Sequence, residues 1–309
     1  MITSLFRKST PLNYALVLLL MLVFFFLYES QVFSGDNLAV FIIKKAGILF
    51  LLLASLFTAN FIIKKNGLSK DSSYTVLFYF LLLLFFPSVL DNFNLIIANF
   101  FILMAIRRLM SLQSMKMQKE KIFDASLWIF AASLFQFWSI LFIVLVFVSI
   151  LFHAAKDYRN WVLPFIAFFA VAVLFLMYAT LTDINIINEL IANAYVNFKI
   201  DYFTNKYQNI ALSIYVSVAL FFITTMGLTL SNRPLILHSA YKKIIVYFFI
   251  GIAIFLISDN KSNDLLLFTF APLAIIATSY IEFSKEQLSQ EIVGFVLIAC
   301  SLFTFFSQL

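Results

Sequence analysis

The chain has 309 residues, of which 63% are hydrophobic and only 12% are charged. A water-soluble chain carries about twice this share of charged residues, so a soluble globular protein is excluded. The net charge of +6 does not indicate a nucleic-acid partner. Membrane proteins reach a similar net positive charge because lysines and arginines are enriched in their cytoplasmic loops. We therefore expect membrane lipids as surroundings and no nucleic-acid partner.

The apolar residues form continuous runs, as at 15–27, 140–152 and 162–181. Strands of a membrane barrel would instead alternate apolar and polar residues over about ten positions. Continuous runs are typical of helices, which satisfy their own backbone groups in hydrocarbon. The sequence predicts an all-α, polytopic transmembrane bundle of about 10–11 helices, forming a single membrane domain over residues 1–309.

In chain order, Arg7 and Lys8 precede the first helix, which has no small-residue cleavage site after it and is read as uncleaved. The next apolar segment, 38–46, carries Lys44 and Lys45, so we expect it to lie in the membrane interface before the second helix. The expected crossings are 13–28, 46–63, 74–89, 93–107, 162–181, 210–230, 244–258, 265–281 and 292–307, besides those within 125–152.

The run 125–152 permits two interpretations. It is long for one straight crossing and short for two. One interpretation is a hairpin of two short helices that turns near Gln136–Ser139 on the outer side. The alternative is one long tilted helix, which reduces the number of crossings to ten.

The positive charges give an orientation. With these helices, all but five of the 21 Lys and Arg residues fall on the side of the N-terminus. This asymmetry predicts a multi-pass protein of the bacterial inner membrane with a cytoplasmic N-terminus. The segment 182–209 is then the longest outer loop, which could form an amphipathic interfacial helix or contact a partner protein.

Motifs of soluble enzymes are missing from the sequence. His153 and His238 stand at expected helix ends, and Cys300 is the single cysteine. No metal centre is predicted from these residues. The expected helices also hold no charged residue deep in the membrane, which argues against an ion-coupled transporter.

Carboxylates in the first two outer loops are the remaining candidates for chemistry. Glu29, Asp36 and Asp91 are candidate catalytic residues, and Gln136 and Trp138 at the hairpin tip are candidate substrate-binding residues. A carboxylate at the membrane boundary could act as a general base or bind a divalent cation as cofactor. The alternative is that these acids are simply solvated by water in their loops.

The order of these features resembles a known family. A basic loop that ends in Lys121-Ile-Phe-Asp-Ala125 precedes the run Ala131-Ala-Ser-Leu-Phe-Gln-Phe-Trp138. Over residues 13–181 the pattern resembles the membrane core of GT-C glycosyltransferases, and it also resembles uncharacterised polytopic inner-membrane proteins of Bacteroidota. The GT-C resemblance implies an acidic residue in the first outer loop, matched by Glu29 or Asp36, and a polyprenyl-phosphate-linked sugar as substrate.

These observations rank three hypotheses. The first is a GT-C-like protein of cell-envelope biogenesis, active or degenerate, that handles a polyprenyl-linked glycan or lipid at the outer membrane–water boundary. Its GT-C-like half, 13–181, would be followed by the outer loop 182–209 and the C-terminal helices 210–309. The alternative is a non-enzymatic membrane subunit of an envelope assembly or secretion complex, bound to other membrane proteins. A transporter ranks third.

Overall fold

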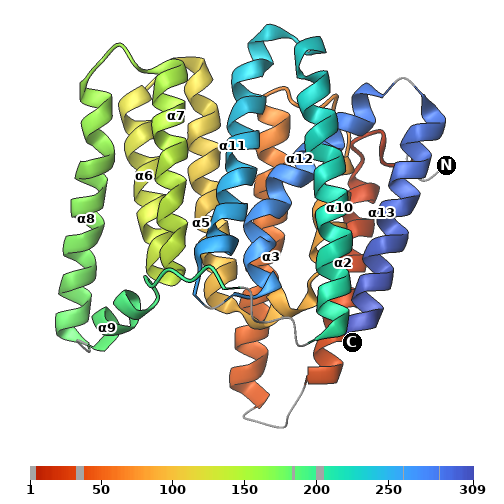
Figure 1. Cartoon of the computed structure of the whole chain (residues 1–309), viewed down its shortest axis with the longest axis horizontal. Helices are drawn as coiled ribbons and strands as arrows, with labels where there is room; N and C mark the ends of the chain where they lie inside the picture. Colours follow the sequence, from red (N-terminus) through yellow and green to blue (C-terminus); the bar gives the residue numbers. More distant parts are fainter. Residues whose placement is uncertain (1–4, 33–37, 183–184, 200–204, 260, 285) are drawn as a thin grey trace.

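The computed structural model describes residues 5–32, 38–182, 185–199, 205–259, 261–284 and 286–309. Within these ranges the chain is almost entirely helical, and the one β-bridge pairs Val196 with Ser258. Among the described residues, eight helices are long and apolar enough to cross a membrane. The predicted all-α transmembrane bundle is therefore confirmed (Figure 1).

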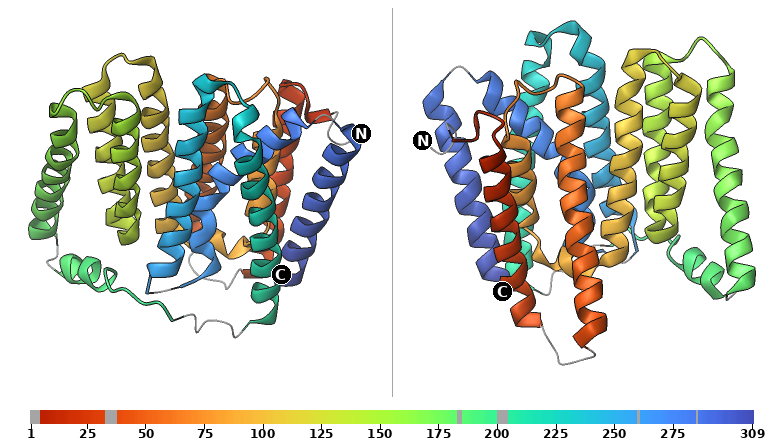
Figure 2. Two further views of the ribbon diagram at one scale, coloured as in Figure 1. Left: turned by 45° about the horizontal axis from the view of Figure 1, so that its top comes forward. Right: turned by 180° about the vertical axis from the view of Figure 1, so that it is seen from behind.

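The helices pack mostly side by side and run up and down between the two ends of the bundle (Figures 1 and 2). Their bounds are α2 Pro11–Val32, α3 Leu38–Lys65, α4 Tyr74–Leu83, α5 Phe93–Met110, α6 Gln118–Phe135, α7 Ile143–His153, α8 Arg159–Leu181, α9 Asn185–Ala192, α10 Lys206–Thr229, α11 Leu235–Ile257, α12 Leu267–Phe283 and α13 Gln287–Gln308. Short 3-10 helices include η1 Pro87–Asp91, η2 Ser111–Ser114, η3 Phe137–Phe142 and η5 Asn263–Leu266.

The two ends of the bundle differ in charge. The basic end carries the loops 66–73, 111–117, 154–158 and 230–234, at the top of Figure 1. The opposite end carries η1, η3, α9 and η5. Because successive crossings alternate in direction, the described N-terminal residues lie at the basic end and the C-terminus at the opposite end.

Two helices, α4 and α12, form the centre of the bundle. All ten residues of α4 are buried, as is most of α12. A helix that is apolar on every side suits such a place, because no face of it meets water. The hydroxyl groups of Thr75 and Thr278 bond across the two helices at 3.0 Å. Peripheral helices such as α8 instead expose large apolar side chains, as a surface in contact with lipid does.

The run 125–152 is a hairpin. Helix α6 ends at Phe135, and Gln136 takes an extended backbone conformation. Helix η3 then turns the chain, and α7 returns beside α6 (Figure 1). The hairpin interpretation is therefore confirmed, and the alternative of one long tilted helix is wrong.

The expected crossing 74–89 is wrong at its end, because α4 stops at Leu83 and the chain then turns toward η1. Two further expected boundaries are wrong, and both of these errors involve lysines. Residues 38–46 belong to α3 and do not form a separate interfacial segment, so Lys45 lies inside a membrane helix. Helix α11 begins at Leu235 and not at 244, which places Lys243 in its third turn with 1% of its surface exposed. Both lysines have partners from distant parts of the chain, which is why burial is possible.

Helices α11 and α12 approach closely at Gly251, where a Cβ atom would lie 2.7 Å from Cγ2 of Thr269. We expect Gly251→Ala to reduce the free energy of unfolding by about 1–3 kcal/mol, because Thr269 is held by a 2.5 Å hydrogen bond to Tyr215. Gly227→Ala is the control, since its Cβ would meet nothing within 4 Å. Denaturation in detergent should separate the two variants, and equal effects would contradict the close packing.

Candidate functional site

Four polar side chains meet at the opposite end of the bundle and form what we call the charged junction: Tyr28, Glu29, Lys45 and Asp91. Tyr28 and Glu29 lie near the C-terminal end of α2, and Lys45 lies in the second turn of α3. Asp91 ends η1. Three elements that are distant in sequence thus contribute one cation and two carboxylates.

Local sequence explains how Asp91 reaches this place. Pro87 lies shortly after the end of α4 and has no backbone N–H to donate to a further helical hydrogen bond. The chain therefore turns through η1. The side chain of Asn92 then accepts a hydrogen bond from the backbone N–H of Leu95 at 3.2 Å and begins α5. Asp91 is the last residue of η1 and directly precedes Asn92, the N-terminal cap of α5, so both elements fix its position.

The geometry of the junction is centred on Lys45. Its Nζ lies 2.7 Å from Oε1 of Glu29 and 3.1 Å from Oδ1 of Asp91. It also donates to the carbonyl of Leu90 at 3.4 Å. The hydroxyl of Tyr28 donates to the other oxygen of Asp91 at 2.6 Å. One ammonium therefore faces two carboxylates, and the junction has a net charge of −1 when all three groups are ionised.

Burial differs strongly within the junction. Glu29 is 7% exposed and Lys45 is 9% exposed, whereas 46% of the Asp91 side chain is exposed. Among the described residues, Oε2 of Glu29 has no hydrogen-bond donor. A buried carboxylate oxygen without a donor is costly. This atom has almost no exposed surface, so a ligand can reach it only if the side chains that cover it move.

A third carboxylate lies beside the junction. Asp264 in η5 accepts a hydrogen bond from Ser88 in η1, and its charge is close enough to interact with that of Asp91. No cluster of three or more His, Cys, Asp or Glu suited to a metal ion occurs in the part of the chain that the structure describes. The ammonium of Lys45 stands between Glu29 and Asp91 and already neutralises part of their charge, so these residues do not fit a divalent cation.

The sequence-based candidates are only partly brought together. Glu29 and Asp91 share the junction, while Asp36 lies outside the described residues. Gln136 and Trp138 lie at the hairpin turn, where the Trp138 ring packs edge-to-face on Phe137. The hydrogen bonds, ion pairs and ring contacts of the described residues do not link this turn to the junction.

The sequence alone does not identify three functional candidates: Tyr28, Lys45 and Lys243. Lys45 was expected in the interface because a lysine in an apolar run costs free energy unless it is paired. Its partners come from residues that the local sequence does not bring near. Lys243 donates to the carbonyl of Leu109, at the C-terminal end of α5, at 2.9 Å. Two membrane helices therefore contain a buried lysine near one end, whereas the sequence placed both lysines outside the helices, so the expected absence of charge is a weaker argument against transport.

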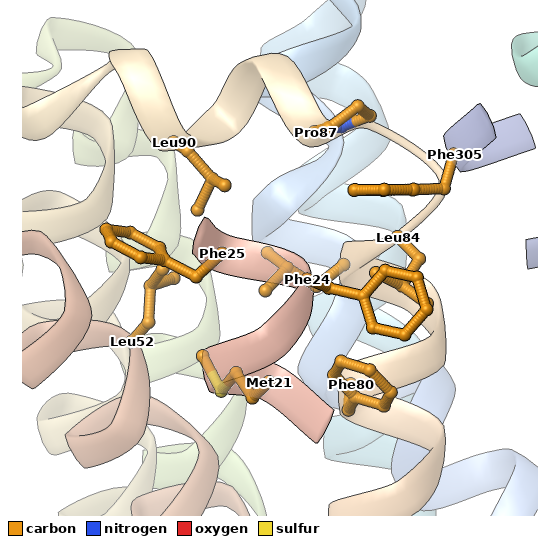
Figure 3. Close-up of a pocket in the computed structure, with 10 residues that line it drawn as sticks. Met21, Phe24, Phe25, Leu52, Phe80, Leu84, Pro87, Leu90 and Phe305 are labelled. Atoms are coloured by element: carbon orange, nitrogen blue, oxygen red, sulfur yellow. The ribbon is translucent and has the colours of Figure 1, made fainter. Parts of the chain in front are cut away.

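An apolar crevice lies next to the junction, between α2, α3, α4 and α13 (Figure 3). Phe25, Leu52, Leu90 and Phe305 are among the residues that line it. Its volume of about 20 Å³ holds roughly one water molecule. The crevice is a packing gap and is too small to hold a lipid chain.

The chain matches the model of a family described as "Family of unknown function (DUF6427)" over residues 5–309. No curated protein and no solved structure matches it. Because the match covers nearly the whole chain, the protein belongs to this family.

Proposed function

We propose that this member of a family of unknown function binds the polar end of a lipid-linked substrate at the charged junction. The observation that carries the proposal is the Glu29–Lys45–Asp91 network, two of whose members lie within membrane helices. Ionisable groups inside a membrane are costly and usually mark a functional site. Here they stand at the end of α2, at a depth where lipid headgroups begin.

The chemistry of the junction suits a hydroxyl-rich headgroup. Asp91 is open to the outside, and Oε2 of Glu29 lacks a donor among the described residues. The exposed carboxylate of Asp91 can accept hydrogen bonds from hydroxyl groups directly, and Glu29 can do so once the side chains that cover it move. Such charge-assisted bonds are strong. A polyprenyl-linked glycan would present its sugar hydroxyls here while its apolar chain lies along the lipid-facing helices. If the protein is an enzyme of cell-envelope biogenesis, the exposed carboxylate of Asp91 is the group placed to accept a proton from a hydroxyl.

The proposal includes an orientation. The basic end would face the cytoplasm, as the excess of Lys and Arg in its loops favours, and the charged junction would face the outer side of a bacterial inner membrane. The predicted outer segment 182–209, which contains α9, would then lie on the same side as the junction.

A purely structural role is the main rival. Lys45 would then only fasten α2, α3 and η1 together, as in a non-catalytic subunit of an envelope complex. The two roles differ in what a neutral substitution does. At the buried Lys45 both roles predict a loss of stability. At the half-exposed Asp91, whose neutralisation leaves the Lys45–Glu29 pair intact, a fastening role predicts unchanged function and a binding role predicts a loss of function in a folded protein.

Complementation of cells that lack the gene distinguishes these roles. We expect Glu29→Gln and Asp91→Asn to accumulate in the membrane but fail to restore the wild-type phenotype, because the amides keep the shape and remove the charge. Asp259→Asn is the matched control, an exposed acid at the same end whose side chain bonds Asn197. If both junction variants restore the phenotype as fully as the control does, the binding role is wrong.

A further inference from the structure

A second polar site lies at the basic end, far from the charged junction. It is a pocket of about 480 Å³ between the end of α3, the α5–η2 turn, the start of α6 and the start of α11. Three cations line it, Lys65, Arg108 and Lys121, and two apolar residues, Ile236 and Leu237, form another part of its wall.

One of the three cations of this pocket has an ion pair among the described residues. Arg108 pairs with Asp124 at 3.0 Å. Lys121 donates to the carbonyl of Ser111 and to Oγ of Ser114, both at 2.7 Å, and Lys65 lies over the ring of Phe61. Lys121 is close enough to Lys65 and Arg108 for their charges to repel. No carboxylate is among the residues that line the pocket.

The general excess of basic residues at this end does not explain the arrangement. That excess requires lysines and arginines in loops, where water separates them. Here three elements bring their cations to one hollow, where mutual repulsion opposes folding. An anion in the pocket removes this repulsion.

The wall of the pocket also has an apolar side. Ile236 is 71% exposed, and its carbonyl accepts a hydrogen bond from Nε2 of Gln113 at 2.8 Å, which links η2 to α11. Cations and polar donors on one side with apolar residues at the membrane side are typical of pockets that bind anionic lipid headgroups. We propose that this pocket binds a phosphate group, carried either by an anionic lipid or by a soluble phosphate.

The test uses the full chain in nanodiscs of equal phosphatidylcholine and phosphatidylglycerol, with retained lipids counted by native mass spectrometry. We expect the wild type to retain phosphatidylglycerol preferentially. Lys65→Gln/Lys121→Gln should lower this preference roughly 30-fold, from the loss of two cations near the membrane surface. Arg108 is left in place because its pair with Asp124 contributes to the fold. A second arm measures thermal stabilisation by inorganic phosphate in nanodiscs of phosphatidylcholine alone.

Lys8→Gln/Lys156→Gln is the matched control, since it removes two exposed cations at the same end outside the pocket. Lipid preference that is lost only in the pocket variant supports a lipid source. Stabilisation by phosphate without lipid preference, again lost only in the pocket variant, supports a soluble source. If neither effect occurs, or both double variants behave alike, the proposed site is wrong. The single variant Lys65→Gln, whose side chain lies over the ring of Phe61, provides the same comparison if the double variant does not fold.

Discussion

Lys45→Met is expected to reduce the free energy of unfolding by about 3–5 kcal/mol, which is the cost of leaving a buried charge without its partner. Lys45 is the only cation within ion-pair distance of Glu29 among the described residues, and Glu29 is 7% exposed. The contribution from Asp91 is smaller, because water screens its half-exposed carboxylate. Denaturation in detergent measures the loss.

Lys44→Met is the matched control for this prediction. Lys44 directly precedes Lys45 in α3 but is exposed, so its substitution should change the free energy of unfolding by less than about 0.5 kcal/mol. A second variant, Lys45→Met/Glu29→Gln, should recover part of the loss, because the neutral amide no longer needs a counterion. Equal losses at positions 44 and 45, or no recovery in the double variant, would contradict the ion-pair account.

The sequence predicted the fold well where the signal is local. Continuous apolar runs marked the crossings, and the length of 125–152 together with Gln136 at its centre indicated a hairpin, which α6, η3 and α7 form. The charge asymmetry predicted which loops gather at one end of the bundle, and Figure 1 shows them there. These signals depend only on residues that are close together in the sequence, so a single sequence is enough to recognise them.

The site was only half predictable, because its chemistry depends on contacts between distant residues. Glu29 and Asp91 were recognised as acids next to helix ends. Lys45 was placed in the interface, because nothing near it in sequence neutralises its charge. Lys243 was placed in a loop for the same reason, although a backbone carbonyl of α5 accepts its hydrogen bond. Where a membrane lysine has a distant partner, a rule based on local charge misplaces the helix boundary.

Neutral substitutions in the charged junction are expected to weaken the binding of a lipid-linked glycan. Glu29→Gln/Asp91→Asn is expected to reduce retention of a polyprenyl-linked glycan at least roughly tenfold, because hydrogen bonds to a charged acceptor contribute about 1.5–3 kcal/mol each. The variant leaves the buried ammonium of Lys45 without a counterion and should be less stable, so retention is compared only for the folded protein recovered in detergent. Asp91→Asn alone keeps the Lys45–Glu29 pair and should lower retention with little loss of stability. Retention of phosphatidylglycerol should not change, because the basic pocket lies at the other end of the bundle.

Native mass spectrometry of the protein purified from its own membranes tests the role of the charged junction most directly. The wild type and Asp259→Asn should each carry a species with the mass of a polyprenyl-linked glycan, and Glu29→Gln/Asp91→Asn should carry at most about a tenth as much. A wild-type protein that carries no such species, or a junction variant that carries as much as the wild type, would contradict the binding of a lipid-linked glycan at Glu29 and Asp91.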